Sequence, residues 1–305
     1  MKAIRIHKYG HADELKLDEI SKPQIANDQV LVRVIDAGVN PVDWKIREGL
    51  AQDRFPVEFP NIMGQDFAGE IEAVGDSVRS FQVGDEVFGF ANGSYAEYVA
   101  VSITAIARKP KTLDFVAAAS IPTAALTAWQ CLLDFGDLRR GQTILIHGAG
   151  GGVGSFACQI AKWKGARIVA NADEADRSYL ESLGVDVIFD YQADRFEESI
   201  QDVDCVLDLI GGQTQRLSLE VMKKGGILVS TVHEMDQAKM LELGLIGKVM
   251  MMKRNGSQLA EISDLVDKGY LIPRLGGIFN LEEAGQAQEF LRTGHPHGKV
   301  VIRVC

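Results

Sequence analysis

The sequence predicts an α/β protein in which a doubly wound parallel-sheet domain is joined to a compact antiparallel β domain. Three observations support this prediction. A glycine-rich turn separates an apolar strand from a helical pattern, apolar strands alternate with helical patterns from about residue 120 to 270, and glycines and prolines punctuate an earlier β-rich part. We expect residues 120–271 to form the parallel-sheet domain, and residues 1–119, completed by 272–305, to form the other.

The glycine-rich turn at residues 148–154 (GAGGGVG) follows an apolar strand at 143–147 and directly precedes a helix with one apolar face. A helix start offers unpaired N–H groups and a positive dipole end, and both attract phosphate. Side chains would hold a phosphate away from those donors. The turn therefore predicts a dinucleotide site rather than a flexible loop. Its expected cofactor contacts are Gly148, Gly151, Gly152, Val153 and Gly154.

The elements after this turn alternate between short apolar runs and helical patterns. We expect strands at 167–171, 187–189, 204–209, 227–231 and 249–252, and helices at about 176–183 and 214–223. Continuous apolar runs are typical of parallel strands that helices cover on both faces. Ligands bind at the carboxyl ends of such strands, so Ile210, Ser230 and Thr231 are further candidate cofactor contacts.

The first part of the chain has a different texture. Residues 30–34 and 70–74 alternate between apolar and polar positions, and glycines follow at short intervals. This pattern is typical of a compact antiparallel β domain. The tail at 298–304 is again apolar, and we expect it to pair back with this first domain as a closing strand.

Composition excludes several classes of protein. The chain has 305 residues, 46% apolar content and a formal net charge of −10 without a basic cluster, which argues against a nucleic-acid or anionic-membrane partner. We expect residues 1–6 to form a strand with no signal peptide ahead of them, and no apolar run is long enough to span a bilayer. The four cysteines form no CxxC pair, which suits a reducing compartment. We therefore expect a cytoplasmic protein.

Four stretches together resemble the medium-chain dehydrogenase/reductase superfamily over nearly the whole chain. They are 37–49 (AGVNPVDWKIREG), 64–69 (GQDFAG) with 83–87 (VGDEV), 123–128 (TAALTA), and the glycine turn with 298–301 (GKVV). They are similar to the zinc-independent branch that holds quinone oxidoreductases and enone (alkenal) reductases. The wide glycine spacing of that branch is met by Gly148, Gly151 and Gly154. The resemblance implies a Rossmann cofactor domain and a GroES-like catalytic domain.

The same resemblance implies that no zinc is held. Zinc-dependent relatives place a Cys where this chain has Asn40, and a His-Glu pair where it has Gln65 and Asp66. A catalytic zinc needs about three Cys, His or acidic ligands. The histidines show no ligand spacing, and we expect His295 and His297 to be an exposed loop pair. Without a Lewis acid, the chemistry should be hydride transfer to an acceptor that is already electrophilic.

The resemblance places the segment with Asn40, Lys45 and Arg47 beside the nicotinamide. Asn40 and Lys45 are the candidate catalytic residues, as donors to a substrate oxygen that gains negative charge. Lys45 could also bind the ribose or phosphates of the cofactor, or be a solvated helix lysine. Asn40 could also cap the helix that starts at Pro41. We expect Arg47 to form a structural ion pair with Asp43.

Further cofactor contacts follow from the resemblance. Thr123 and Thr127 occupy the stretch that lines the nicotinamide end in relatives, and Thr127 is the favoured contact. Two buried threonines at a helix start are the alternative. Tyr191 matches a family position that contacts the adenosine ribose or its phosphate.

The choice between NAD and NADP depends on the segment after the second strand, residues 171–177. Asp173 lies near the offset of about 20 residues at which an acid binds the adenosine ribose of NAD. Arg177 is the base of this segment and could accept a 2′-phosphate instead. The acids favour NAD or cap the next helix, whereas the family favours NADP. We expect NADP(H), with NAD(H) as the alternative.

We therefore expect a metal-free reductase that transfers a hydride from NAD(P)H to a small electrophilic substrate, a quinone or an α,β-unsaturated carbonyl. The alternatives are a zinc-free alcohol or aldehyde oxidoreductase and a non-catalytic NADPH-binding sensor. Relatives form dimers through their nucleotide domains, so we expect a homodimer joined along the strand at 249–252. The methionines at 250–252 could line an adaptable pocket, but a run of this kind is more often core.

Overall fold

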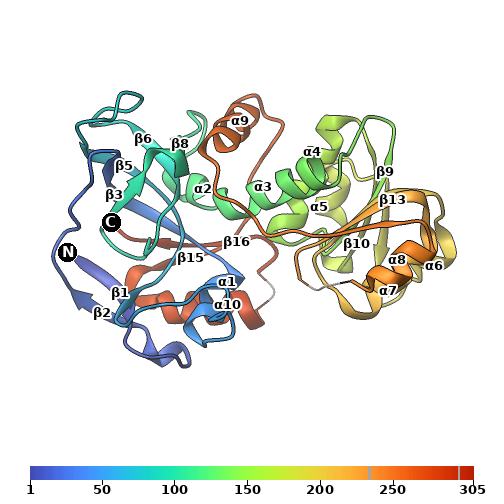
Figure 1. The fold of residues 1–305 in the computed structure, drawn as a ribbon, viewed down its shortest axis with the longest axis horizontal. Helices are drawn as coiled ribbons and strands as arrows, with labels where there is room; N and C mark the ends of the chain where they lie inside the picture. Colours follow the sequence, from blue (N-terminus) through green and yellow to red (C-terminus); the bar gives the residue numbers. More distant parts are fainter. Residues whose placement is uncertain (233–234, 295) are drawn as a thin grey trace. The chain divides into compact units, whose positions relative to one another are not determined.

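The computed structural model describes residues 1–232, 235–294 and 296–305, so His295 lies outside the described residues. The chain forms two compact units, residues 1–123 with 254–305 (unit 1) and residues 124–253 (unit 2) (Figure 1). The chain returns to unit 1 at Arg254, earlier than the expected residue 272. The reason is that helix α9 (Gly256–Asp267) packs against β8 (Ile106–Arg108) of unit 1, where Ser263 Oγ donates to the Arg108 carbonyl at 3.0 Å.

Unit 1 is built mainly from strands. They are β1 (Lys2–Ile6), β2 (Lys16–Glu19), β3 (Gln29–Val39), β4 (Asn61–Ile62), β5 (Asp66–Val74), β6 (Glu86–Phe90), β7 (Tyr98–Ser102), β8, β15 (Leu275–Asn280) and β16 (Lys299–Arg303). Its helices besides α9 are α1 (Pro41–Arg47), α2 (Phe115–Ala119) and α10 (Ala284–Thr293), with short 3₁₀ turns at Ala12–Glu14, Ile103–Ala105 and Leu281–Glu283.

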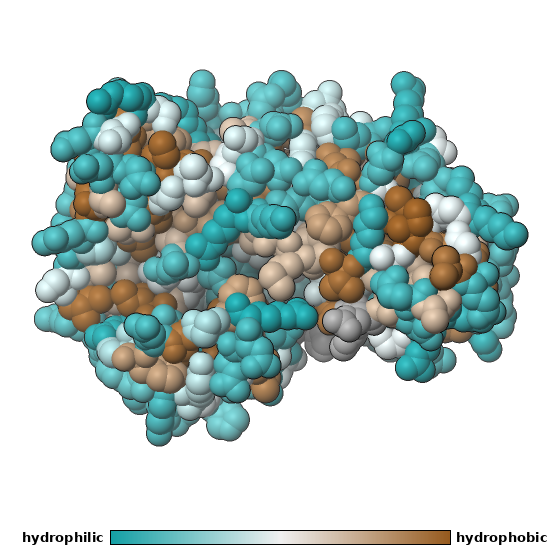
Figure 2. Space-filling view, viewed as in Figure 1, coloured by the Kyte–Doolittle hydropathy of each residue, from teal (hydrophilic) through white to brown (hydrophobic). Residues whose placement is uncertain are grey.

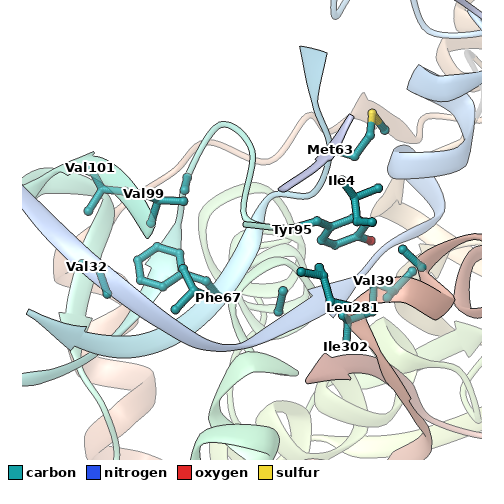
Figure 3. Packing of buried hydrophobic residues seen from close by; sticks show 14 of the residues in the cluster. Ile4, Val32, Val39, Met63, Phe67, Tyr95, Val99, Val101, Leu281 and Ile302 are labelled. Carbon is teal, nitrogen blue, oxygen red and sulfur yellow. The ribbon is translucent and has the colours of Figure 1, made fainter. Parts of the chain in front are cut away.

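The larger sheet of unit 1 has the order β15-β16-β3-β5-β6-β8, and β7 also pairs with β3. β16 lies antiparallel to β3, with Val300 opposite Val39. The expected closing strand is therefore present, and it is an inner strand. The core beneath these strands is aliphatic and aromatic, and Figure 3 shows Tyr95 lying among its labelled apolar side chains.

Unit 2 is the doubly wound parallel sheet. Its strands are β9 (Thr143–His147), β10 (Arg167–Ala172), β11 (Val187–Asp190), β12 (Val203–Asp208), β13 (Met222–Ser230) and β14 (Ile246–Val249), in the order β11-β10-β9-β12-β13-β14. Its helices are α4 (Gly152–Lys164), α5 (Arg177–Ser182), α6 (Phe196–Ser199), α7 (Gly212–Val221) and α8 (Gln237–Glu242); α3 (Pro122–Trp129) starts in unit 1 and leads into it, followed by a π-helical turn at Gln130–Phe135. A 3₁₀ turn at Glu174–Asp176 precedes α5. Strand order reverses between β10-β9 and β9-β12, where such sheets bind ligands.

The parallel sheet of unit 2 and the larger, mainly antiparallel sheet of unit 1 confirm the predicted fold class, but several boundaries were wrong. The last parallel strand is β14, which ends at Val249, so Met250–Met252 does not continue it. Ser230 is opposite Val249 in the pairing of β13 with β14. Met250 is buried, whereas Met251 is 52% exposed, so the methionine run is only partly core.

No helix among the described residues has both the length and the apolar character that a membrane crossing requires. Figure 2 shows hydrophilic side chains over much of the visible surface, with smaller apolar patches between them.

Candidate functional site

The glycine turn joins β9 to α4 at the point where the strand order reverses. Gly148 has φ +72°, a conformation that favours glycine, and its carbonyl accepts from Gly151 N–H at 3.1 Å. A Cβ at Gly154 would lie 2.2 Å from the Gly148 oxygen, so no side chain fits there. The backbone thus folds tightly over the first turn of a 13-residue helix. This is the geometry that binds a pyrophosphate.

Asp208 organises the next part of this strand edge. It ends β12 and is fully buried, and its Oδ1 accepts from Ile210 N at 3.0 Å and Gly211 N at 2.7 Å. Its Oδ2 accepts from Ser230 Oγ at 2.9 Å and Gln215 Nε2 at 2.8 Å. The Ser230 hydroxyl is therefore committed to the protein interior.

Two other predicted contacts lie at this strand edge. Ile210 is 56% exposed and sits beside the glycine turn, since a Cβ at Gly148 would be 3.2 Å from its Cδ1. Thr231 follows β13 directly, and its N–H donates to the Asp208 carbonyl at 3.2 Å. Ile210 therefore lies beside the turn, and Thr231 lies beside the end of β12.

The segment after β10 brings together the residues that were predicted to decide between NAD and NADP. Asp173 caps the 3₁₀ turn through Ala175 N at 2.9 Å, and its Oδ2 lies 3.4 Å from Tyr191 Oη and 3.2 Å from Gln192 Nε2. Arg177 Nε lies 2.8 Å from both carboxylate oxygens of Glu174. The Tyr191 hydroxyl thus lies beside the Asp173 carboxylate, and the Arg177 guanidinium lies beside a different carboxylate, that of Glu174.

His147 ends β9 immediately before the glycine turn and is fully buried. Burial lowers its pKa to about 4, which leaves the ring neutral. Asn171 Nδ2 lies 3.2 Å from Nδ1, so Nδ1 accepts and Nε2–H donates to Ser218 Oγ at 2.7 Å. The His147 ring therefore links β9 to β10 through Asn171 and to α7 through Ser218.

In unit 1, Asn40 is the N-cap residue of α1 and forms the capping box of this helix with Asp43. Its Oδ1 also accepts from the ammonium of Lys299, which donates in addition to the Val39 carbonyl at 3.1 Å. The helix start is closed by Asp43, whose Oδ2 accepts from Asn40 N–H at 2.8 Å. Asn40 is 2% exposed, so its side chain lies inside a buried polar cluster.

Two buried acids complete this cluster. Asp66 Oδ1 accepts from Thr123 Oγ1 at 2.5 Å and Oδ2 from Thr123 N at 3.0 Å, and Oδ2 lies 4.0 Å from Lys299 Nζ. Asp43 Oδ2 also accepts from Tyr95 Oη at 2.9 Å. Burial raises the pKa of both acids, that of Asp43 to about 7, and burial lowers the pKa of Lys299.

Lys45 and Arg47, the other predicted residues of α1, lie in different environments, one exposed and one buried. Lys45 is exposed, with its ammonium 5.6 Å from the centre of the Trp44 ring. The expected ion pair between Arg47 and Asp43 was wrong. Arg47 is fully buried, and its guanidinium binds Gln288 and Glu289 at 2.9 and 2.8 Å. Helix α10 carries these two partners, so Arg47 fastens α1 to α10.

Of the two threonines predicted at the nicotinamide end, Thr123 is half-buried and Thr127 is buried. Thr123 binds Asp66, as described above. Thr127 lies in α3 and is 8% exposed. Within unit 2 it is therefore mainly a buried helix residue.

Three residues of these clusters were not predicted as functional. Asp208 could have been found, because an acid that ends a buried strand before two glycines is unusual. Asp66 and Lys299 stood in segments that carried the family resemblance, but nothing in the sequence indicated that they would meet.

The donor set does not fit a zinc ion. At the place where zinc-dependent relatives have a Cys, the Asn40 oxygen is already bound to an ammonium, and Asp66 is occupied by Thr123. A second cation beside Lys299 would be repelled. Among the described residues, no three His, Cys, Asp or Glu side chains gather as metal ligands. We therefore derive no step through a metal.

Fold and site together define a two-domain oxidoreductase of the dinucleotide-binding class. Residues 26–111 match the family description "Alcohol dehydrogenase GroES-like domain" and residues 183–302 match "Zinc-binding dehydrogenase". The NADPH-dependent alkenal/one oxidoreductase of Arabidopsis thaliana chloroplasts is 33% identical over 99% of this chain and 79% of its own length. The quinone oxidoreductase of Mus musculus is 31% identical over 99% of this chain and 97% of its own.

A solved structure shows the same arrangement of elements. The quinone oxidoreductase from Coxiella burnetii matches with a TM-score of 0.92 and 34% identity, covering 100% of this chain and 99% of that one. The chain belongs to the medium-chain dehydrogenase/reductase superfamily, in its zinc-independent quinone and enone reductase branch.

Proposed function

We propose that the protein reduces a quinone or an α,β-unsaturated carbonyl with a hydride from NAD(P)H, without a metal. The observation that carries this proposal is the glycine turn between β9 and α4 at the switch point of the parallel sheet. The names of the relatives support the acceptor class, since they are alkenal/one and quinone oxidoreductases. The unsuitability of the Asn40 and Asp66 cluster for zinc supports an acceptor that needs no Lewis acid.

Bound NAD(P)H supplies the hydride, and the chain supplies position and charge. In an enone, the β-carbon gains the hydride while the carbonyl oxygen gains negative charge as an enolate. Lys45 and Asn40 are the proposed donors to that oxygen. A proton from solvent then reaches the α-carbon, so one hydride and one proton saturate the double bond.

Replacing Lys45 by Ala tests the donor role. We expect kcat/KM for an enone to fall about 10- to 100-fold, because one hydrogen bond to the developing oxyanion is lost. Lys45 is exposed, so the melting temperature should change little. Full kcat/KM in the variant would remove Lys45 from the mechanism.

For the reductant we propose NADPH, with Arg177 as the acceptor of its 2′-phosphate. The NADPH-dependent relative supports this choice. The Glu174–Arg177 pair is partly exposed, with 33% of the Arg177 and 58% of the Glu174 side chain accessible, and such pairs are weak enough for a phosphate to replace the carboxylate. Comparison of kcat/KM with NADPH and NADH tests the proposal, and a strong preference for NADH would overturn it.

An acceptor panel tests the reaction itself. Purified protein with NADPH should turn over enones or quinones. Turnover of simple alcohols alone would instead indicate an alcohol oxidoreductase. Tight NADPH binding without turnover of any acceptor would indicate a sensor.

We also propose a cytoplasmic homodimer joined along β14. β14 is the edge of the parallel sheet, and Ile246 and Val249 on it are 46% and 40% exposed. An uncovered apolar edge favours pairing with a second copy. Sedimentation should show a dimer at micromolar concentration, and a monomer would exclude this interface. Three of the four cysteines are buried and unpaired, which suits a reducing compartment.

A further inference from the structure

Lys299 is a buried cation to which the proposed chemistry assigns no role. Its side chain is 6% exposed, and its ammonium binds the Asn40 and Val39 oxygens and lies 4.0 Å from Asp66. A buried ammonium is costly unless it is paired and hydrogen-bonded, and here its neighbours are set by the fold. Lys299 therefore merits a functional explanation.

The strand register explains why Lys299 meets Asn40. β16 and β3 are antiparallel, with Val300 opposite Val39 and Val301 opposite Gly38. One step further along the same register, Lys299 stands beside Asn40, where β3 ends and α1 starts. Pairing of two inner strands holds both backbones, so the contact does not depend on a mobile loop.

The ammonium determines which way the Asn40 carboxamide faces. An ammonium has only donors, so it binds the amide oxygen and repels the amide NH₂. With Oδ1 held by Lys299, Nδ2 must point the other way. Nδ2 is buried and has no hydrogen-bond partner among the described residues.

Asp66 is an acid close to the Asn40 side chain, which helps to lower the pKa of Asp66 against the larger effect of burial. Nδ2 is nevertheless without a hydrogen-bond partner among the described residues. A carboxamide has two N–H donors, so at least one remains for a ligand even if Asp66 attracts the other.

We propose that Lys299 is a positioning residue, which orients Asn40 so that its Nδ2–H donates to the oxygen of the bound enone or quinone. This inference rests on the proposed function and extends it to a residue outside the segment with Asn40 and Lys45. Lys299 itself touches no substrate. It excludes the flipped carboxamide, which would present an acceptor to the developing oxyanion.

The Asn40→Asp variant removes the N–H donor of Asn40 but keeps the contact with Lys299. An aspartate keeps an oxygen against the Lys299 ammonium and gains an ion pair, but it has no N–H donor. We expect a melting temperature close to that of the wild type and a kcat for enone reduction about 100-fold lower. The Kd for NADPH, measured by fluorescence, should stay within about twofold, because the glycine turn and the Asp173 segment are unchanged.

The Lys299→Met variant tests whether Lys299 acts through Asn40. We expect kcat about 10- to 100-fold lower with little change in the Kd for NADPH. The double variant with Asn40→Ala should be no slower than Asn40→Ala alone, because residues that act as one unit are not additive. Lys299→Arg should recover part of the rate, since a guanidinium also binds the amide oxygen.

Lys109→Met is the matched control. Lys109 is another buried lysine of unit 1, and it binds the Leu113 and Pro110 carbonyls and Glu86. The Lys109→Met variant should be less stable than the wild type and keep the wild-type kcat/KM. Three results would overturn the inference: full activity in Asn40→Asp, full activity in Lys299→Met, or additive effects in the double variant.

The assay also distinguishes this inference from the proposed function. If the wild type reduces an enone and the variants match it, only the role of Lys299 fails. If the wild type reduces neither enones nor quinones, the proposed function fails, and the inference fails with it. Should Lys299→Met not fold, Lys299→Ala is measured in its place, and full kcat in that variant would overturn the inference.

Discussion

Asp43 shows how a single buried carboxylate can make stability depend on pH. It is fully buried, and burial raises its pKa from 3.8 to about 7, while Asn40 N–H and the Tyr95 hydroxyl oppose the rise. Between these two values the folded protein holds a proton that the unfolded chain releases. The stability contributed by this proton is present below pH 3.8 and is lost as pH rises through about 7.

Asp43→Asn should remove this loss, because an amide stays neutral and its oxygen can still accept from Asn40 and Tyr95. We expect the unfolding free energy of the wild type to fall by ~2–4 kcal/mol more than that of the variant between pH 4 and 8. Denaturant titrations at several pH values would measure the difference. Parallel pH profiles for the two proteins would contradict it.

At the scale of elements, the junction of β9 with α4 separates glycines that the backbone needs from glycines that the ligand needs. A Cβ at Gly154 would strike the Gly148 carbonyl at 2.2 Å, whereas one at Gly151 would meet that oxygen at 3.4 Å, an ordinary contact. Gly154→Ala should therefore lower the melting temperature and abolish NADPH binding.

Gly151→Ala is the comparison for this variant. Gly151 is exposed at the N-cap of α4, so a methyl group there should leave folding intact and weaken NADPH about tenfold or more by obstructing the phosphates. Calorimetry with NADPH and thermal melts would measure both effects. Equal stability of the two variants, or unchanged affinity in Gly151→Ala, would refute the assignment of the turn.

At the scale of the whole molecule, the described residues bring no three His, Cys, Asp or Glu side chains together as zinc ligands, and this gives a simple expectation. Incubation with EDTA should leave enone reduction within about 20% of its initial rate, since the Lys299 ammonium stands among the groups that could otherwise bind a cation. Metal analysis of the active protein checks this result. One zinc per subunit whose removal abolishes activity would contradict it.

The fold was largely predictable because its determinants are local. Apolar strands, helix faces and the glycine turn lie within a few residues of one another, and they indicated both units. Strand ends were less predictable, since pairing with a neighbour sets them: β14 ends at Val249, opposite Ser230. Arg47 was assigned Asp43 as its partner one helical turn away, but its guanidinium binds Gln288 and Glu289 of α10, far along the chain.

The buried polar cluster was the hardest part to predict. Lys299, Asp66 and Asp43 are residue types that usually lie on surfaces, and each belongs to a different element. Only strand pairing brings Lys299 to Asn40, and no spacing rule connects positions so distant in sequence. The glycine turn could be predicted, whereas the polar cluster around Asn40 required the structure.

The position of β16 inside the unit 1 sheet has a consequence for biosynthesis. Ribosomes synthesise residues 124–253 before β15 and β16. Unit 2 can therefore fold while the larger sheet of unit 1 still lacks β16, the neighbour of β3, and β15, the neighbour of β16. Until those strands emerge, residues 36–39 of β3 lack their partner strand and Asn40 has no lysine beside it. Nascent chains stalled shortly before residue 275 should therefore show a protease-resistant unit 2 and a protease-sensitive unit 1.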